Sequence, residues 1–140
     1  GVTTTSTQIS ITATVQPYCA ISASTLSFGT YSARTSDATT TIGVTCTTLT
    51  AYTVGLDQGV SSGATVSTRA MTGPSGALLQ YGLYSDAAHS RNWGNSAATG
   101  WVSETGLGIR QSLTVYGEVP AGQYPEPGSY SDTIIATITY

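Results

Sequence analysis

The chain has 140 residues, of which 8% are charged, and its four arginines, seven acidic residues and lack of lysine give a formal net charge of -3. This length suits one domain with a single hydrophobic core. So few basic side chains argue against a phosphate-binding surface, so we expect no nucleic-acid partner. No apolar run approaches the ~20 residues of a membrane-spanning helix, and we expect no membrane insertion.

Serine and threonine make up roughly a third of the chain, and with valine, isoleucine and tyrosine they favour strands over helices. The content of hydrophobic residues, 39%, and the recurring period-two alternation argue against disorder. We therefore predict an all-β fold of seven or eight short antiparallel strands. An immunoglobulin-like sandwich, a jelly roll and a small barrel are all compatible with this pattern.

The first alternating run carries apolar side chains at every second position before Gln16 and Pro17 end it. These apolar residues are Ile9, Ile11, Ala13 and Val15. Extended, residues 2–15 would measure about 46 Å, whereas a compact sphere of this chain length is about 37 Å across. We expect part of the run to project from the domain as a template for pairing with another chain. The alternative is a disordered leader followed by an ordinary strand from Gln8.

Two further runs, residues 42–46 and 52–56, alternate on either side of a turn at residues 47–50, which predicts a hairpin. Cys19 and Cys46 are either two buried free thiols or a disulfide. A disulfide would close a loop of about 27 residues and contribute about 3.5 kcal/mol in the chain-entropy model. Such a bond suits an extracytoplasmic protein.

The second half of the chain contains three more strand patterns. They cover residues 78–84, residues 113–119 and a final run in which Ile134, Ala136, Ile138 and Tyr140 share one side. The intervening stretch, residues 85–108, has no regular alternation, and we expect it to be irregular.

Candidate catalytic and metal-binding residues are sparse. The single histidine, His89, stands near Asp86 and Ser90 in the irregular stretch, and we interpret it as a solvated loop residue. Two cysteines and one histidine show no zinc-site spacing, and no glycine-rich phosphate loop is present. We therefore expect no enzyme activity, no metal and no cofactor. The acids Glu104, Glu118, Glu126 and Asp132 have no spacing that favours glycoside hydrolysis, and Asp132 is expected to cap backbone amides.

A set of short motifs runs in order from about Cys19 to Tyr140. They are Phe28-Gly29-Thr30-Tyr31, Val44-Thr45-Cys46, Leu56-Asp57-Gln58-Gly59, Arg69-Ala70-Met71, Tyr81-Gly82-Leu83-Tyr84-Ser85-Asp86, Trp93-Gly94, Val115-Tyr116-Gly117-Glu118-Val119-Pro120, Gly128-Ser129-Tyr130-Ser131-Asp132-Thr133 and the final Ile138-Thr139-Tyr140. Each motif is weak alone, but the ordered set is specific. With these motifs the chain resembles the archaic chaperone-usher pilins, whose domain is also called spore coat protein U.

The resemblance implies an incomplete immunoglobulin-like β-sandwich that lacks its last strand and exposes its core in a groove. Residues 17–140 would form this domain, with Ile134, Ala136 and Ile138 as one wall of the acceptor groove. Residues 1–16 would be a donor strand that fills the groove of a neighbouring subunit. The donor side chains would be the apolar row of the first run, Ile9, Ile11, Ala13 and Val15. The resemblance also implies a disulfide between Cys19 and Cys46.

The implied partners are identical subunits in a homopolymer, preceded during assembly by a periplasmic chaperone and an outer-membrane usher. The implied location is an extracellular pilus, reached through the periplasm, that supports adhesion and biofilm formation. The alternative is a carbohydrate-binding adhesin domain at or near a pilus tip. Its sugar platform would use aromatic side chains, namely Trp93, Trp101, Tyr81, Tyr84 and Tyr116.

Overall fold

The computed structural model describes residues 1–140 and is an all-β sandwich, as predicted. The elements are β1 (Cys19–Ala23), β2 (Ser36–Cys46), β3 (Ala51–Leu56), β4 (Arg69–Thr72), the 3-10 helix η1 (Pro74–Gly76), β5 (Leu78–Tyr84), the 3-10 helix η2 (Ala97–Thr99), β6 (Val102–Thr105), β7 (Arg110–Val119) and β8 (Ala136–Thr139). All strand pairs are antiparallel. Neither short helix has the length or the apolar character needed to cross a membrane.

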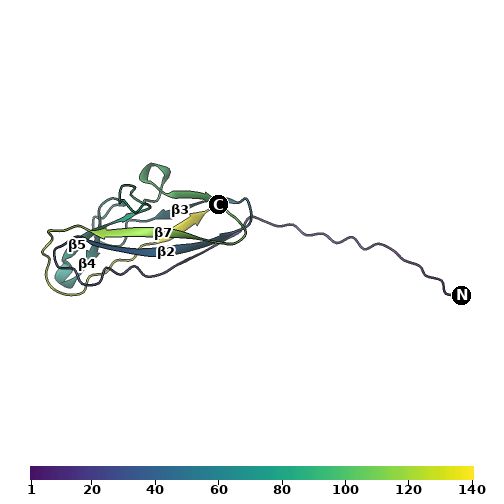
Figure 1. The fold of residues 1–140 in the computed structure, drawn as a ribbon, viewed down its shortest axis with the longest axis horizontal. Coiled ribbons are helices and arrows are strands. Elements are labelled where there is room, and N and C mark those ends of the chain that lie inside the picture. Colours follow the sequence, from purple (N-terminus) through teal and green to yellow (C-terminus); the bar gives the residue numbers. More distant parts are fainter.

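The strands form two sheets that face each other (Figure 1). The larger sheet has five strands in the order β1-β2-β7-β5-β4, and the smaller has three in the order β6-β3-β8. The longest pairing joins β2 to β7, from Ser36 opposite Val119 to Thr45 opposite Arg110. This arrangement leaves β1 at an edge of the larger sheet and β8 at an edge of the smaller one.

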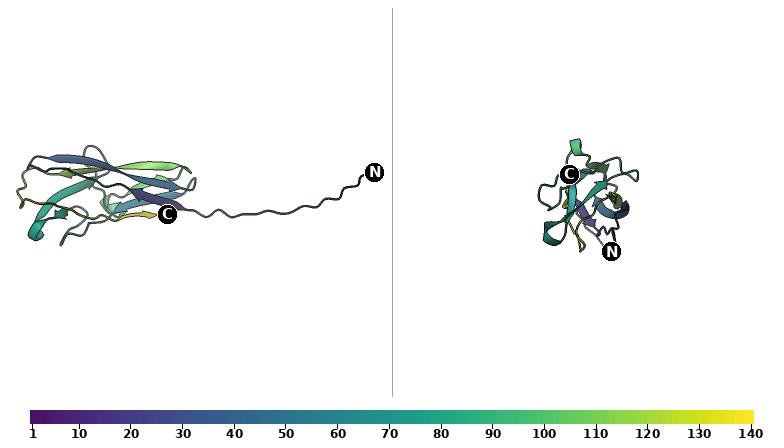
Figure 2. Two further views of the ribbon diagram at one scale, coloured as in Figure 1. Left: turned by 90° about the horizontal axis from the view of Figure 1, so that it is seen from below. Right: turned by 90° about the vertical axis from the view of Figure 1, so that its left-hand side faces the viewer.

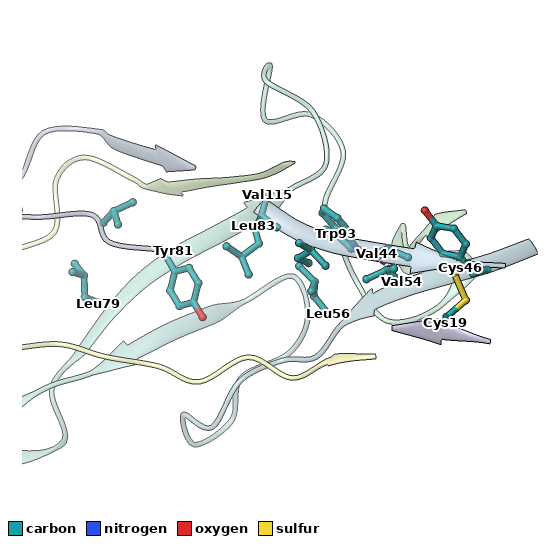
Figure 3. Close-up of a cluster of buried hydrophobic side chains, with 13 residues drawn as sticks. Cys19, Val44, Cys46, Val54, Leu56, Leu79, Tyr81, Leu83, Trp93 and Val115 are labelled. Atoms are coloured by element: carbon teal, nitrogen blue, oxygen red, sulfur yellow. Dashed lines mark hydrogen bonds between the residues drawn. A yellow bond between two sulfur atoms is a disulfide. The ribbon is translucent and has the colours of Figure 1, made fainter. Parts of the chain in front are cut away.

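The core lies between the sheets and receives side chains from both (Figure 3). Val44 of β2 and Val54 of β3 are fully buried, and Trp93 from the irregular stretch is 1% exposed. The indole Nε1 of Trp93 donates a hydrogen bond to the carbonyl oxygen of Val54 at 2.9 Å, so the polar atom of this large side chain is paired. In β5 the side chains of Leu79, Tyr81 and Leu83 point into the core, as the alternation predicted.

Arg69 is a buried cation, 1% exposed, that links the two sheets. From β4 its Nε donates to the carbonyl oxygen of Asp57 at 2.9 Å, and its Nη2 donates to the carbonyl oxygens of Leu56 at 3.0 Å and Trp93 at 2.8 Å. Burial lowers the pKa of the guanidinium from its usual value. The side chain thus pairs carbonyl groups at the end of β3 and in the stretch that contains Trp93.

A disulfide joins Cys19 to Cys46, which confirms the predicted bond. The two residues lie directly opposite each other in the pairing of β1 with β2. Cys19 is the first residue of β1, so the bond fixes the place where the N-terminal segment enters the sandwich (Figure 3).

The predicted hairpin is wrong. β2 pairs with β1 and β7, whereas β3 pairs with β6 and β8, so the two strands lie in different sheets. The turn at residues 47–50, in which Leu49 has a positive φ of 65°, carries the chain from one sheet to the other. Both strands alternate because both face the same core, and the alternation does not reveal which strands pair.

The expectation of an irregular stretch at residues 85–108 is wrong in part, because it contains η2 and β6. β6 has a mostly exposed sequence, Val102-Ser103-Glu104-Thr105, and offers no apolar alternation. Two other short strands, β1 and β4, were not predicted either. The pairing of each is set by a longer neighbouring strand.

Candidate functional site

Residues 1–18 lie outside both sheets and leave one end of the sandwich as an extended chain (Figures 1 and 2). The first backbone hydrogen bonds to the domain are made by Tyr18, whose N–H donates to Thr47 Oγ1 at 3.1 Å and whose carbonyl oxygen accepts from the Thr47 N–H at 2.9 Å. These bonds and the adjacent disulfide hold the exit point. The expectation that the first run projects from the domain is confirmed.

The apolar row of this segment is open to solvent. The side chains of Ile9, Ile11 and Val15 are 82%, 88% and 82% exposed, and Ala13 is exposed as well. In an extended chain these alternate residues share one face, and the polar residues Gln8, Ser10, Thr12 and Thr14 share the other. No charged side chain occurs in residues 1–18. The segment can therefore be buried without the cost of desolvating a side-chain charge.

β8 presents an unpaired edge. Its four residues pair with β3, from Ala136 opposite Leu56 to Thr139 opposite Thr53, and no strand lies on its other side. The N–H and C=O groups that point away from β3 are therefore available to another strand. The structure gives β8 one neighbour where the strands in the middle of each sheet have two.

The side chains along β8 are less buried than those of the strand beside it. Ala136 and Leu56 are cross-strand partners on the same face, yet Leu56 is 2% exposed and Ala136 is only partly buried. Ile134 and Ile138 are partly buried too, and all three predicted acceptor residues contact the core. The core is thus incompletely covered along this edge.

The core is also incompletely covered along β1, one of the two edge strands of the larger sheet. Ile21 of β1 and the residues Leu26 and Phe28 that follow it are partly buried against the core. The start of β1 and the end of β8 lie at the same end of the sandwich, from which the N-terminal segment departs (Figure 2). Both sheets therefore contribute an edge strand whose apolar side chains are only half covered.

Two aspartates hold the segment that leads into β8. Asp132 Oδ1 accepts from the N–H groups of Val60 and Thr133, both at 2.9 Å, and its Oδ2 accepts from Tyr81 Oη at 2.5 Å. The expected amide-capping role of Asp132 is confirmed. Burial and this carboxylate raise the pKa of Tyr81. Asp57 Oδ1 accepts from the N–H of Ile135 at 2.9 Å, so β8 is positioned by polar contacts rather than by a second strand.

His89 does not form a Ser-His-Asp arrangement with its sequence neighbours. Asp86 instead accepts hydrogen bonds from the Ser90 hydroxyl and from the N–H groups of Arg91 and Ser90, and these bonds lower the pKa of its carboxyl. The His89 side chain is 18% exposed and lies 3.2 Å from Glu118, measured from Nδ1 to Oε2. The interpretation of His89 as a solvated loop residue is wrong in part, because the residue lies in the loop after β5 but its side chain is mostly covered and contacts Glu118.

The aromatic residues do not form one exposed platform. Trp93 and Tyr81 belong to the core, while Tyr84 and Tyr116 are partly buried on β5 and β7. Trp101 is partly buried beside shallow hollows over the outer face of the smaller sheet, next to Thr53 and Thr139. Core packing accounts for Trp93.

The family of the chain follows from comparison with known proteins. A model of the Spore Coat Protein U domain matches residues 4–137. The chain belongs to this family. Protein U from Myxococcus xanthus is 38% identical over 129 residues, which cover 83% of this chain and 72% of that protein. The family resemblance of the sequence motifs is thereby confirmed.

A solved structure shows the same fold. It is the chaperone–tip adhesion subunit pre-assembly complex from the archaic chaperone-usher Csu pili of Acinetobacter baumannii, one chain of which superposes with a TM-score of 0.68 at 22% identity. The match covers 91% of this spore coat protein U domain and 41% of the other chain. The domain therefore spans about two fifths of the length of that chain.

Proposed function

We propose that this spore coat protein U domain is a structural subunit of a bacterial surface pilus assembled by donor-strand exchange. Residues 1–16 of one copy would insert beside β8 of the next copy and complete its sandwich. Membership of the family and the likeness in fold to a chain from a chaperone-usher pilus complex support this proposal.

The free edge of β8 carries the proposal. A strand added there would pair with the open N–H and C=O groups and cover the partly buried row Ile134, Ala136 and Ile138. The N-terminal segment has the matching properties, because it is extended, uncharged and apolar at every second residue. Ile9, Ile11, Ala13 and Val15 would face the core, and the polar face of the segment would remain toward solvent.

The energy of insertion comes from both the backbone and the side chains. Each buried isoleucine or valine contributes about 1.5–3 kcal/mol of transfer free energy before the cost of ordering the segment. Ala13 contributes less, so its pocket on the partner is expected to be shallow. Dissociation would require the completed core to open, so the mechanical durability of a filament would be kinetic.

The same contacts explain why insertion would join different copies. Tyr18 and the Cys19–Cys46 disulfide fix the exit of the segment, which extends away from its own domain (Figure 1). One copy therefore presents a donor at one place and an acceptor edge at another. Such a head-to-tail contact generates an open filament where the rotation between successive copies does not close a ring.

Assembly by this route would require a protector for the open edge before polymerisation, because an exposed edge strand with apolar side chains is prone to aggregation. We assign that role to a periplasmic chaperone, and the replacement of the chaperone by the next donor to an outer-membrane usher. The finished filament would lie outside the cell, where it would support adhesion and biofilm formation.

The test is deletion of residues 1–14 with co-expression of the remainder and its chaperone. We expect a soluble chaperone complex that forms no filaments, since the acceptor edge is intact and the donor is gone. The matched control replaces residues 1–7 with Gly and Ser and keeps the apolar row, and it is expected to polymerise. Normal filaments from the deleted chain, seen by electron microscopy, would rule out the donor role.

A further inference from the structure

A cluster of ionisable side chains lies on the outer face of the larger sheet. Asp37 of β2 and Glu118 of β7 are direct cross-strand partners, and the outward direction of both follows from the burial of Val119 and Gly117 beside Glu118. Two carboxylates placed opposite each other on one face repel. The pair is therefore unfavourable unless a cation lies between them.

The side chain of His89 reaches this pair of carboxylates. Its Nδ1 lies 3.2 Å from Glu118 Oε2, the single contact of this length between a basic and an acidic side chain in the structure. Its ring packs edge-on against Tyr84, with 5.3 Å between the ring centroids. One ligand atom from each of Asp37, His89 and Glu118 lies within 4.8 Å of the other two. Three separate elements, β2, β7 and the loop after β5, thus converge on one point.

We propose that Asp37, His89 and Glu118 bind a divalent transition-metal ion of the Zn²⁺ class. Imidazole nitrogen and carboxylate oxygen are both ligands of such ions, with bonds of about 2.0–2.2 Å. Two ligands on one tetrahedral ion at that length are separated by about 3.4 Å, close to the distance between Nδ1 and Oε2. The exposed Asp37 side chain is free to turn toward the ion, and water completes the coordination.

Contacts around the three proposed ligands hold them in place. The β2–β7 register places the two carboxylates, and Asp86 holds the loop through the N–H groups of Ser90 and Arg91. Metal binding would neutralise the repulsion and tie the loop to the sheet. Because the ligand sets of Ca²⁺ and Mg²⁺ consist of oxygen atoms, the imidazole favours Zn²⁺ over both ions.

The test is equilibrium dialysis of the tag-free full chain against ZnCl₂ at pH 7.5, with bound metal measured per chain. We expect one Zn²⁺ per chain, with affinity lowered at least tenfold by His89→Gln and also lowered by Asp37→Asn and Glu118→Gln. Glu104→Gln, on the smaller sheet, is the matched control and should bind as the unchanged chain does. Zn²⁺ should also raise the unfolding temperature of the unchanged chain more than that of His89→Gln.

Three results would overturn the metal site. These are the absence of one-to-one binding, equal binding by the His89→Gln chain, and binding of Ca²⁺ as tight as that of Zn²⁺. Circular dichroism checks that the variants are folded. If His89→Gln does not fold, the exposed Asp37→Asn change decides the question, because equal Zn²⁺ affinity in that variant excludes the three-ligand site.

Discussion

Val54 and Ile138 lie opposite each other in the pairing of β3 with β8, and their side chains point to the same face of the sheet. Val54 is fully buried, whereas Ile138 is only partly buried. The two positions differ in their neighbours, since β3 lies between two strands and β8 has one. The difference in burial is what a missing strand beside β8 would produce.

The first prediction compares two adjacent positions in the donor segment. Ile11→Asp would place an unpaired carboxylate in an apolar site, and filaments should fail to form or should dissociate in mild detergent. Thr12→Asp carries the same charge on the opposite face and should assemble normally. Electron microscopy and sedimentation measure filament assembly by each variant. Equal assembly of the two variants would contradict the predicted register.

The second prediction makes the same comparison on the acceptor side. Ile138→Asp should prevent a chain from accepting a donor, whereas Thr137→Asp, which points outward, should be tolerated. When mixed with unchanged subunits, the Ile138→Asp chain retains its own donor segment and should therefore be found at one filament end only. Labelled variant chains distributed along the whole filament would contradict this role of β8.

The third prediction concerns Arg69. Arg69→Ala would leave the carbonyl oxygens of Leu56, Asp57 and Trp93 without this donor inside the protein, and we expect a loss of about 3 kcal/mol or more in the free energy of unfolding. Arg34→Ala, on an exposed arginine, should change it by less than about 0.5 kcal/mol. Urea denaturation of the full chain measures both. A similar small effect at both positions would show that Arg69 does not hold the sheets together.

The fourth prediction concerns the disulfide. Replacing Cys19 and Cys46 together with serine removes a constraint across 27 residues, and the free energy of unfolding should fall by about 3.5 kcal/mol. The fall should be accompanied by faster amide hydrogen exchange in β1, because the bond joins β1 to its single partner strand. If the free energy of unfolding and the hydrogen exchange of β1 are unchanged, the pairing with β2 holds β1 in place without the disulfide.

The strands that sequence patterns predicted are those with a long apolar face. β5 and β7 follow the alternation, because one face of each meets the core. β4 and β6 have four residues each and too few alternating positions to be recognised. The error in pairing β2 with β3 has a different origin, since strand partners are set by the three-dimensional arrangement of the sheets.

The exposed apolar row of residues 9–15, the proposed donor, could be predicted because it is local, with its apolar residues two positions apart. The proposed acceptor role of Ile134, Ala136 and Ile138 required a family resemblance, since nothing in the alternation of residues 134–140 shows that β8 lacks a neighbour. The convergence of Asp37, His89 and Glu118 was beyond prediction from spacing. This convergence depends on the register of β2 against β7, which pairs Asp37 with Glu118, and on the loop that brings His89 to Glu118.

The most direct measurement of the donor-strand account is a density map of the assembled filament that resolves side chains. We expect an added strand, hydrogen-bonded to the free edge of β8, that belongs to a neighbouring copy. In that strand Ile9, Ile11, Ala13 and Val15 should point toward Ile134, Ala136 and Ile138. A filament in which the edge of β8 remains unpaired, or is paired by a segment other than residues 1–16, would contradict the account.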